Sequence, residues 1–94
     1  MERPHYVYLL HCADDTYYVG QTSDLNRRLE QHRQGQGVGL TPKRLPVRLA
    51  WRRAFPTRGV ARAAEKQVKQ WDRAHKEALI AGDFRLLARL DGGG

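Results

Sequence analysis

The chain has 94 residues, 17 of them lysine or arginine and 10 acidic, which gives a formal net charge of +7 and a pI of about 10.2. This length supplies one hydrophobic core, so residues 1–94 are expected to form a single domain with a flexible tail at 91–94. No run approaches the roughly 20 apolar residues of a membrane span, and a lone cysteine, Cys12, cannot form an internal disulfide, so a cytoplasmic protein is expected. The positive charge favours nucleic acid as a partner, although many small basic domains bind none.

The N-terminal part carries a hairpin signal. A run of aromatic and aliphatic residues at 5–12 is followed by the turn-forming sequence ADDT and by a second β-prone run at 17–21. Side chains alternate between the two faces of a strand, which places Tyr18 and Gly20 on one face of the second strand. If this is also the face on which Tyr8 lies, the two phenols point to the same side of the sheet.

Capping residues bound the first predicted helix. The sequence TSD precedes the helix-prone run LNRRLEQHRQ at 25–34, and a glycine follows it. Leu25, Arg28, Leu29 and His32 share one stripe of this helix. An arginine on an inward stripe requires an anionic partner.

Three further segments follow. Residues 35–46 hold three glycines and two prolines and predict an irregular loop, which in a domain of this size is typically functional or disordered. A third strand is predicted at 47–54, and Thr57 caps a longer helix on which apolar residues recur at helical spacing, from Ala61 to Trp71. Shorter helical segments are predicted at 76–81 and 84–90.

Glu65 stands on the apolar stripe of the longer helix, four residues after Ala61 and three before Val68. A carboxylate in that position costs several kcal/mol unless it is paired or bound to a metal. One interpretation is an internal ion pair with Arg28 in a protein of structural role. The other is a cluster of Glu65, Arg28 and the strand tyrosines, although most strand tyrosines are core residues with solvated hydroxyls.

Four motifs together carry a family resemblance. The triplet YVY at residues 6–8 is followed ten residues later by YVG at 18–20, then by SDLNRR with Arg28 and His32, and by ARAAEKQVKQW around Glu65. This pattern resembles the GIY-YIG nucleases over nearly the whole chain, most closely the small stand-alone Slx1-like or UPF0213-type branch. The resemblance implies an α+β fold with a small three-stranded antiparallel sheet flanked by helices, in the order β-β-α-β-α-α.

The same resemblance implies endonucleolytic hydrolysis of a phosphodiester bond, with catalytic roles for Tyr8, Tyr18, Arg28, His32 and Glu65. Glu65 would bind Mg²⁺ or Mn²⁺ through its carboxylate, and Arg28 would hold the scissile phosphate. Tyr8 would act as the base, with its pKa lowered by Arg28 and the metal ion. Tyr18 would bind the phosphate or orient Tyr8, and His32 is the alternative base.

The chain departs from the family pattern in two places. Tyr6 replaces the glycine of the first motif, and the asparagine that many members carry after the last helices is replaced by Gly82 and Asp83. The second departure puts one polar contact of the site in doubt. It keeps open the alternative of a nucleic-acid-binding module on the same fold without catalysis.

Contacts with nucleic acid are expected around and after the glycine-rich loop, from Thr41, Lys43, Arg44 and Arg48, with Arg52 and Arg53 on or near the third strand. No feature is of the kind that reads base edges, so recognition of structure rather than of base sequence is expected. DNA, including DNA under repair, is favoured over RNA, and no membrane partner is expected. A separate protein partner would provide targeting.

Overall fold

The computed structural model describes residues 3–35 and 42–92. A central strand pairs antiparallel with both of its neighbours, in the strand order β2-β1-β3. The elements in chain order are β1 (His5–Cys12), β2 (Tyr17–Thr22), α1 (Leu25–Arg33), the 3-10 turn η1 (Pro42–Arg44), β3 (Val47–Phe55), α2 (Arg58–Gln70), α3 (Arg73–Ala81) and α4 (Phe84–Gly92). The predicted α+β fold, a three-stranded antiparallel sheet flanked by helices, is confirmed.

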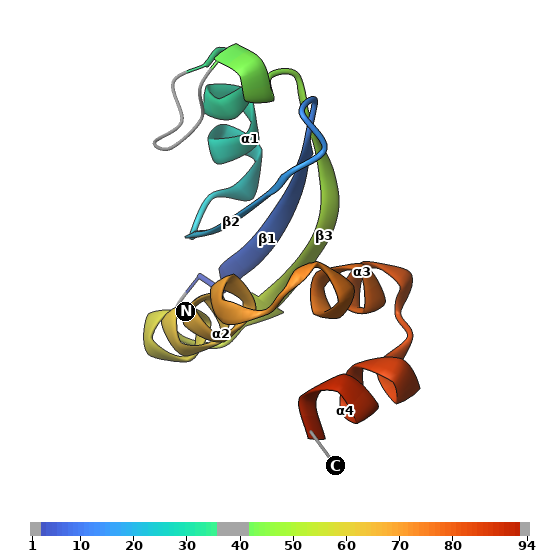
Figure 1. The fold of residues 1–94 in the computed structure, drawn as a ribbon. Coiled ribbons are helices and arrows are strands. Elements are labelled where there is room, and N and C mark those ends of the chain that lie inside the picture. Colours follow the sequence, from blue (N-terminus) through green and yellow to red (C-terminus); the bar gives the residue numbers. More distant parts are fainter. Residues whose placement is uncertain (1–2, 36–41, 93–94) are drawn as a thin grey trace.

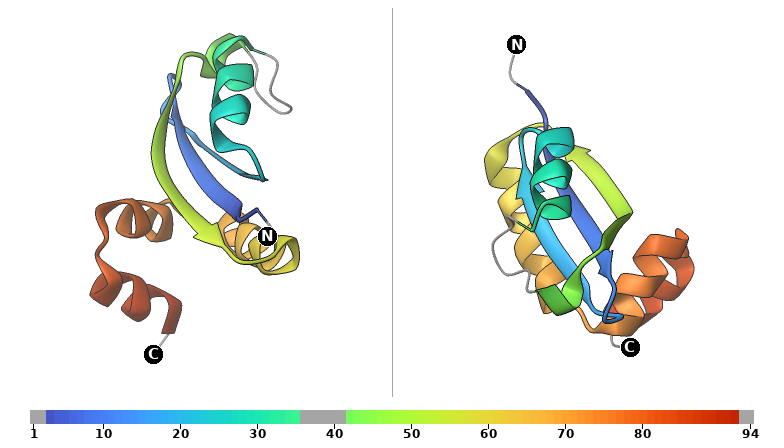
Figure 2. Two further views of the ribbon diagram at one scale, coloured as in Figure 1. Left: turned by 180° about the vertical axis from the view of Figure 1, so that it is seen from behind. Right: turned by 90° about the horizontal axis from the view of Figure 1, so that it is seen from above.

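Helices lie on both sides of this sheet (Figure 1). α1 covers one face, and α3 and α4 lie on the side away from α1 (Figure 2). On the α1 side, Tyr8 and Leu10 form a buried cluster with Leu25, against which Tyr18 packs. The cluster on the other side contains Val7, Leu9, Val19, Ala61, Val68 and Leu79. Of the helices formed by the described residues, none is both long and apolar enough to cross a bilayer.

The ends of α2, α3 and α4 differ from the predicted helix boundaries. The carboxylate of Asp72 accepts a hydrogen bond from the backbone N–H of His75 at 3.0 Å, so α3 begins at Arg73, three residues earlier than predicted. Trp71 is therefore the extended C-cap of α2 rather than part of its helical stripe. α4 continues through Gly92, so the first two residues of the expected tail are helical.

Gly20 lies directly opposite Tyr8 in the pairing of β1 with β2. A Cβ atom at Gly20 would overlap the Tyr8 hydroxyl and would lie 2.5 Å from its Cζ atom. The Tyr8 ring therefore extends over the backbone of β2, where any side chain would displace it. Because β2 is an edge strand, the bare backbone at Gly20 lets the hydroxyl reach that edge of the sheet.

Replacing Gly20 with alanine should lower the free energy of unfolding by about 1–3 kcal/mol, because the new methyl group overpacks the Tyr8 ring. The matched control is Gly59→Ala in α2, where a Cβ atom would meet nothing within 4 Å. That variant should be neutral or slightly more stable, since alanine favours the helix. Urea denaturation of both variants checks the expectation, and equal stabilities would show that Tyr8 does not need the space above Gly20.

Candidate active site at the β2 edge

The Tyr8 hydroxyl is the meeting point of the polar side chains on the α1 side of the sheet. Its oxygen lies 2.9 Å from Nε2 of His32, and the Arg28 side chain hydrogen-bonds the same phenol. The Tyr18 ring stands beside both, with its centroid 6.5 Å from that of Tyr8 and 5.2 Å from that of His32. The structure thus brings together four of the five predicted catalytic residues.

The start of α1 is fixed to the end of β2, which aims its inward stripe at Tyr8. The Asp24 carboxylate accepts from the backbone N–H of Arg27 at 3.2 Å and caps the helix. The Thr22 hydroxyl in turn accepts from the N–H of Asp24 at 3.1 Å. Arg28 and His32 stand four residues apart, so both face the phenol from successive turns.

Burial sets the protonation state of Tyr8. The side chain is fully buried, and this desolvation raises its pKa to about 12, although the hydrogen bond and the charge of Arg28 act in the lowering direction. Arg28 therefore acts in the expected direction, but in the protein alone burial outweighs it, and the expected net lowering of the Tyr8 pKa is wrong. The cost of burying a phenolate exceeds its attraction to the guanidinium, so Tyr8 is a neutral phenol at physiological pH.

His32 is also fully buried, and burial lowers its pKa, with a further lowering from the Arg28 charge. The imidazole is therefore neutral at pH 7, with one ring nitrogen as donor and the other as acceptor. Its Nδ1 atom is buried and has no hydrogen-bond partner among the described residues. Nε2 can accept the Tyr8 proton in one tautomer and donate to the phenol oxygen in the other.

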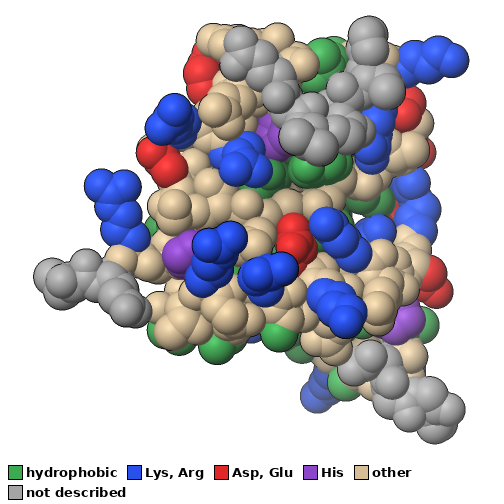
Figure 3. Space-filling view, turned by 90° about the vertical axis from the view of Figure 1, so that its left-hand side faces the viewer, with side chains coloured by type: hydrophobic (Ala, Val, Ile, Leu, Met, Phe, Trp, Pro, Cys, Tyr) green, Lys and Arg blue, Asp and Glu red, His purple; other side chains and the backbone are tan. Residues whose placement is uncertain are grey.

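Glu65, the fifth predicted catalytic residue, lies on α2. Its side chain is 18% exposed and forms an ion pair with Lys69, with 3.4 Å between Oε2 and Nζ. Its negative charge acts to raise the Tyr8 pKa and is the smallest of the causes of that shift. Within residues 3–35 and 42–92 no ion pair joins Glu65 to Arg28, so the purely structural interpretation of these two residues finds no support. On the face that contains α1 and β2, acidic side chains are surrounded by lysines and arginines (Figure 3).

The donor set fits a hard divalent cation held by a single carboxylate. In the described part of the chain, no three His, Cys, Asp or Glu side chains gather as a metal centre. Mg²⁺ requires only one or two carboxylates when waters and substrate phosphates complete its shell. Glu65, a partly exposed oxygen donor, meets that requirement, whereas a closed site of the zinc type would need four protein ligands.

A polar cavity of ≈ 310 Å³ adjoins Arg28 and reveals two residues that the sequence analysis missed. His5 and Arg58 line it, with Gln21, Thr22 and Ser23. Arg58 is in the first turn of α2, and its position beside Arg28 depends on how α2 crosses the end of the sheet (Figure 1). Two guanidinium groups at one cavity form a suitable environment for a phosphate.

Arg44, predicted as a nucleic-acid contact, forms hydrogen bonds within the protein. Its Nε donates to the Thr16 hydroxyl at 3.0 Å and its Nη2 to the Tyr17 carbonyl at 3.0 Å. The guanidinium also lies 5.8 Å from the centroid of the Tyr18 ring. Arg44 thus ties η1 to the hairpin and supports one of the site tyrosines.

The other described residues predicted to contact nucleic acid do not gather on one surface. Lys43 is exposed in η1, and Thr41 lies outside the described residues. Arg48 donates to Nδ1 of His11 at 3.3 Å, on the sheet face opposite Tyr8. Arg52 pairs in register with Tyr8 and so belongs to the α1 face, whereas Arg53 belongs to the opposite face.

Neither residue at the position of the family asparagine contributes to the cluster. Gly82 ends α3 in the left-handed conformation, with φ at 71°. The Asp83 carboxylate accepts from the N–H of Leu86 at 3.0 Å and caps α4. Both residues therefore act as helix caps.

Replacing His32 with glutamine should make folding less sensitive to acid. The folded protein holds the His32 pKa below the value of about 6.5 in the unfolded chain. The unfolded chain therefore takes up more protons below pH 6.5, and the wild type loses stability as the pH falls through that value. Thermal melts at pH 7.5 and 5.5 should show a smaller decrease in Tm for His32→Gln than for the wild type, and equal decreases would contradict the assigned shift.

The chain is similar in sequence to a known family of domains. Residues 4–78 match the GIY-YIG catalytic domain. A UPF0213 protein of Natronomonas pharaonis is 40% identical over 83 residues, which cover 88% of this chain and 98% of the relative. One from Halobacterium salinarum is 43% identical over 76 residues, which cover 81% and 99%.

Two solved structures are also similar. The solution NMR structure of a UPF0213 protein from Bacillus halodurans has 38% sequence identity and a TM-score of 0.56, and the match covers 93% of this chain and 96% of that one. The solution NMR structure of a protein from E. faecalis has 35% identity and a TM-score of 0.62, over 88% of each chain. The chain therefore belongs to the GIY-YIG family and is related within it to the UPF0213 proteins.

Proposed function

We propose that the protein is a metal-dependent nuclease that hydrolyses phosphodiester bonds in nucleic acid, with DNA favoured over RNA and structure selected rather than base sequence. The observation that carries this proposal is the convergence of Arg28 and His32 on the Tyr8 hydroxyl, with the Glu65 carboxylate close enough to influence its pKa. In this proposal Arg28 is the phosphate ligand, the Tyr8–His32 pair carries the proton, and Glu65 is the metal ligand.

Arg28 would bind the scissile phosphate. Its planar guanidinium lines the ≈ 310 Å³ cavity beside the cluster, together with Arg58. Two parallel N–H donors suit the oxygens of a phosphate better than an ammonium does. Arg58 would hold the same phosphate or its neighbour along the strand.

Glu65 would hold the metal ion through a carboxylate oxygen. Mg²⁺ or Mn²⁺ in that position would neutralise the charge that develops on the scissile phosphate and on the leaving oxygen. Lys69 would give up its ion pair with Glu65, at small cost because the pair is partly exposed. The released ammonium would then be available to the nucleic-acid backbone.

Tyr8 and His32 would carry the proton as a pair. A phenol with a pKa of about 12 is a weak source of phenolate at neutral pH. When Tyr8 donates to neutral His32, its oxygen can take a proton from the attacking water while its own proton passes to Nε2. A phosphate bound at Arg28 would offset the positive charge that lowers the His32 pKa. Because Tyr8 is fully buried, a shift of Arg28 toward the phosphate would admit the water.

Glu65→Gln should abolish cleavage while leaving nucleic-acid binding within about twofold of the wild type, because the amide keeps the shape but loses the charge that holds the metal. Labelled hairpins, flaps, branched junctions and single strands, incubated with Mg²⁺ or Mn²⁺, provide the assay. The control is Glu77→Gln, an exposed glutamate of α3 that pairs with Arg73. This control should cut at the wild-type rate.

Two results would count against the proposal in different ways. A Glu65→Gln protein that cuts in magnesium at nearly the wild-type rate would remove the metal assignment. A wild-type protein that shifts these substrates on a gel but produces no fragments would instead support the non-catalytic binding module.

A further inference from the structure

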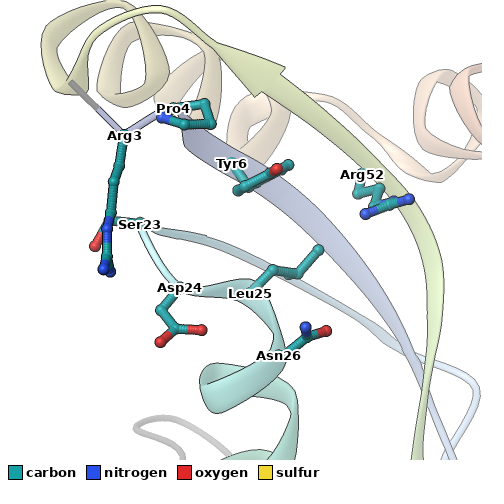
Figure 4. Close-up of a pocket in the computed structure, with 8 residues that line it drawn as sticks. All are labelled: Arg3, Pro4, Tyr6, Ser23, Asp24, Leu25, Asn26 and Arg52. Atoms are coloured by element: carbon teal, nitrogen blue, oxygen red, sulfur yellow. The ribbon is translucent and has the colours of Figure 1, made fainter. Parts of the chain in front are cut away.

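A second pocket lies on the α1 side of the sheet, between the N-terminal segment, the start of α1 and β3 (Figure 4). Its volume of ≈ 300 Å³ is at the lower end of the range for small-molecule sites. The lining combines one aromatic ring, Tyr6, with two arginines, Arg3 and Arg52, and the polar side chains of Ser23 and Asn26. The catalytic scheme proposed above uses none of these residues.

This pocket adjoins the two cavities that Arg28 lines. Tyr6 stands two residues before Tyr8 in β1 and packs against the same buried cluster. Ser23 lines this pocket and also both of the cavities that Arg28 lines. A polar path therefore leads from Arg28 around Ser23 to Tyr6, so a strand with a phosphate at Arg28 can continue into the pocket.

The charge in the pocket is positive and available. Arg3 and Arg52 are exposed, and neither forms a hydrogen bond or an ion pair with any residue in the described part of the chain. The carboxylate of Asp24, which also lines the pocket, is already engaged as the cap of α1. An aromatic face flanked by free guanidinium groups is the arrangement that holds bases and phosphates of unpaired strands.

We propose that this pocket binds an unpaired nucleotide next to the scissile phosphate, with its base stacked on Tyr6 and its flanking phosphates held by Arg3 and Arg52. The inference rests on the proposed function for the location of the scissile phosphate. A base inside a duplex has neighbours on both faces and cannot stack on Tyr6. The pocket therefore selects single-stranded segments of DNA or RNA without reading their sequence.

The test measures binding in EDTA, by fluorescence anisotropy of labelled dT₁₂, rU₁₂ and a blunt hairpin duplex whose two strands are joined by a non-nucleotide linker, so that it has no unpaired bases. Tyr6→Leu, which keeps an apolar side chain but loses the planar ring, should weaken single-strand binding about 5- to 100-fold and leave hairpin binding within twofold. Tyr6→Phe should retain single-strand affinity. Phe84→Leu, at an aromatic residue of α4 that is 66% exposed, is the matched control and should bind as the wild type does.

Unchanged binding by folded Tyr6→Leu, or an equal loss for single strand and hairpin, would overturn the proposal. If circular dichroism shows that Tyr6→Leu is unfolded, the proposal is tested with Arg52→Gln instead. It should reduce the log-log salt dependence of single-strand binding by about 0.7 and leave that of the hairpin unchanged, and an unaltered slope overturns the proposal. Because EDTA removes the divalent metal ions, these binding results do not depend on whether the protein cleaves its substrate. Tighter binding of dT₁₂ indicates DNA as the source of the unpaired strand, and tighter binding of rU₁₂ indicates RNA.

Discussion

The hydrogen bond between the Tyr8 hydroxyl and Nε2 of His32, 2.9 Å long and fully buried, is the contact on which the site depends. A buried hydroxyl requires a partner, and the partner here belongs to α1, so the bond fixes the helix against the sheet. Its geometry also requires the bare backbone of Gly20, since a Cβ atom there would overlap the hydroxyl. The tyrosine and glycine of the two strand motifs and the histidine of the helix therefore meet a single packing requirement.

Burial also keeps Tyr8 and His32 uncharged when no substrate is bound. Desolvation keeps Tyr8 protonated and His32 neutral, while Arg28 is the charged member of the cluster and lines the adjoining cavity together with Arg58. A phosphate is the ligand that would change this balance, because it partners the guanidinium whose charge disfavours an imidazolium. Coupling of proton transfer to phosphate binding would protect the protein from unproductive chemistry in the absence of substrate.

Local patterns predicted most of the fold. Alternation placed Tyr18 and Gly20 on one face of their strand, and helical spacing placed Arg28 and His32 on one stripe, because both depend only on neighbouring residues. That Tyr8 shares the face of Tyr18 depends on how the two strands pair. The raised pKa of Tyr8 could not be predicted, since desolvation depends on how tightly α1 closes over the sheet. The hairpin bonds of Arg44 and the cavity position of Arg58 likewise arise from contacts between segments far apart in the chain.

The most direct measurement of the central claim is the pH dependence of single-turnover cleavage by the wild type and by Tyr8→Phe, with Tyr17→Phe on the opposite sheet face as control. If the Tyr8–His32 pair carries the proton, the wild-type rate should be constant from pH 7 to 9, where His32 is neutral. Because burial lowers the His32 pKa, the rate should fall only at a pH below the ordinary histidine pKa of about 6.5. Tyr8→Phe should be slower by roughly 10²- to 10⁴-fold at every pH, and Tyr17→Phe should be unaffected. Cleavage by Tyr8→Phe at the wild-type rate would contradict the account.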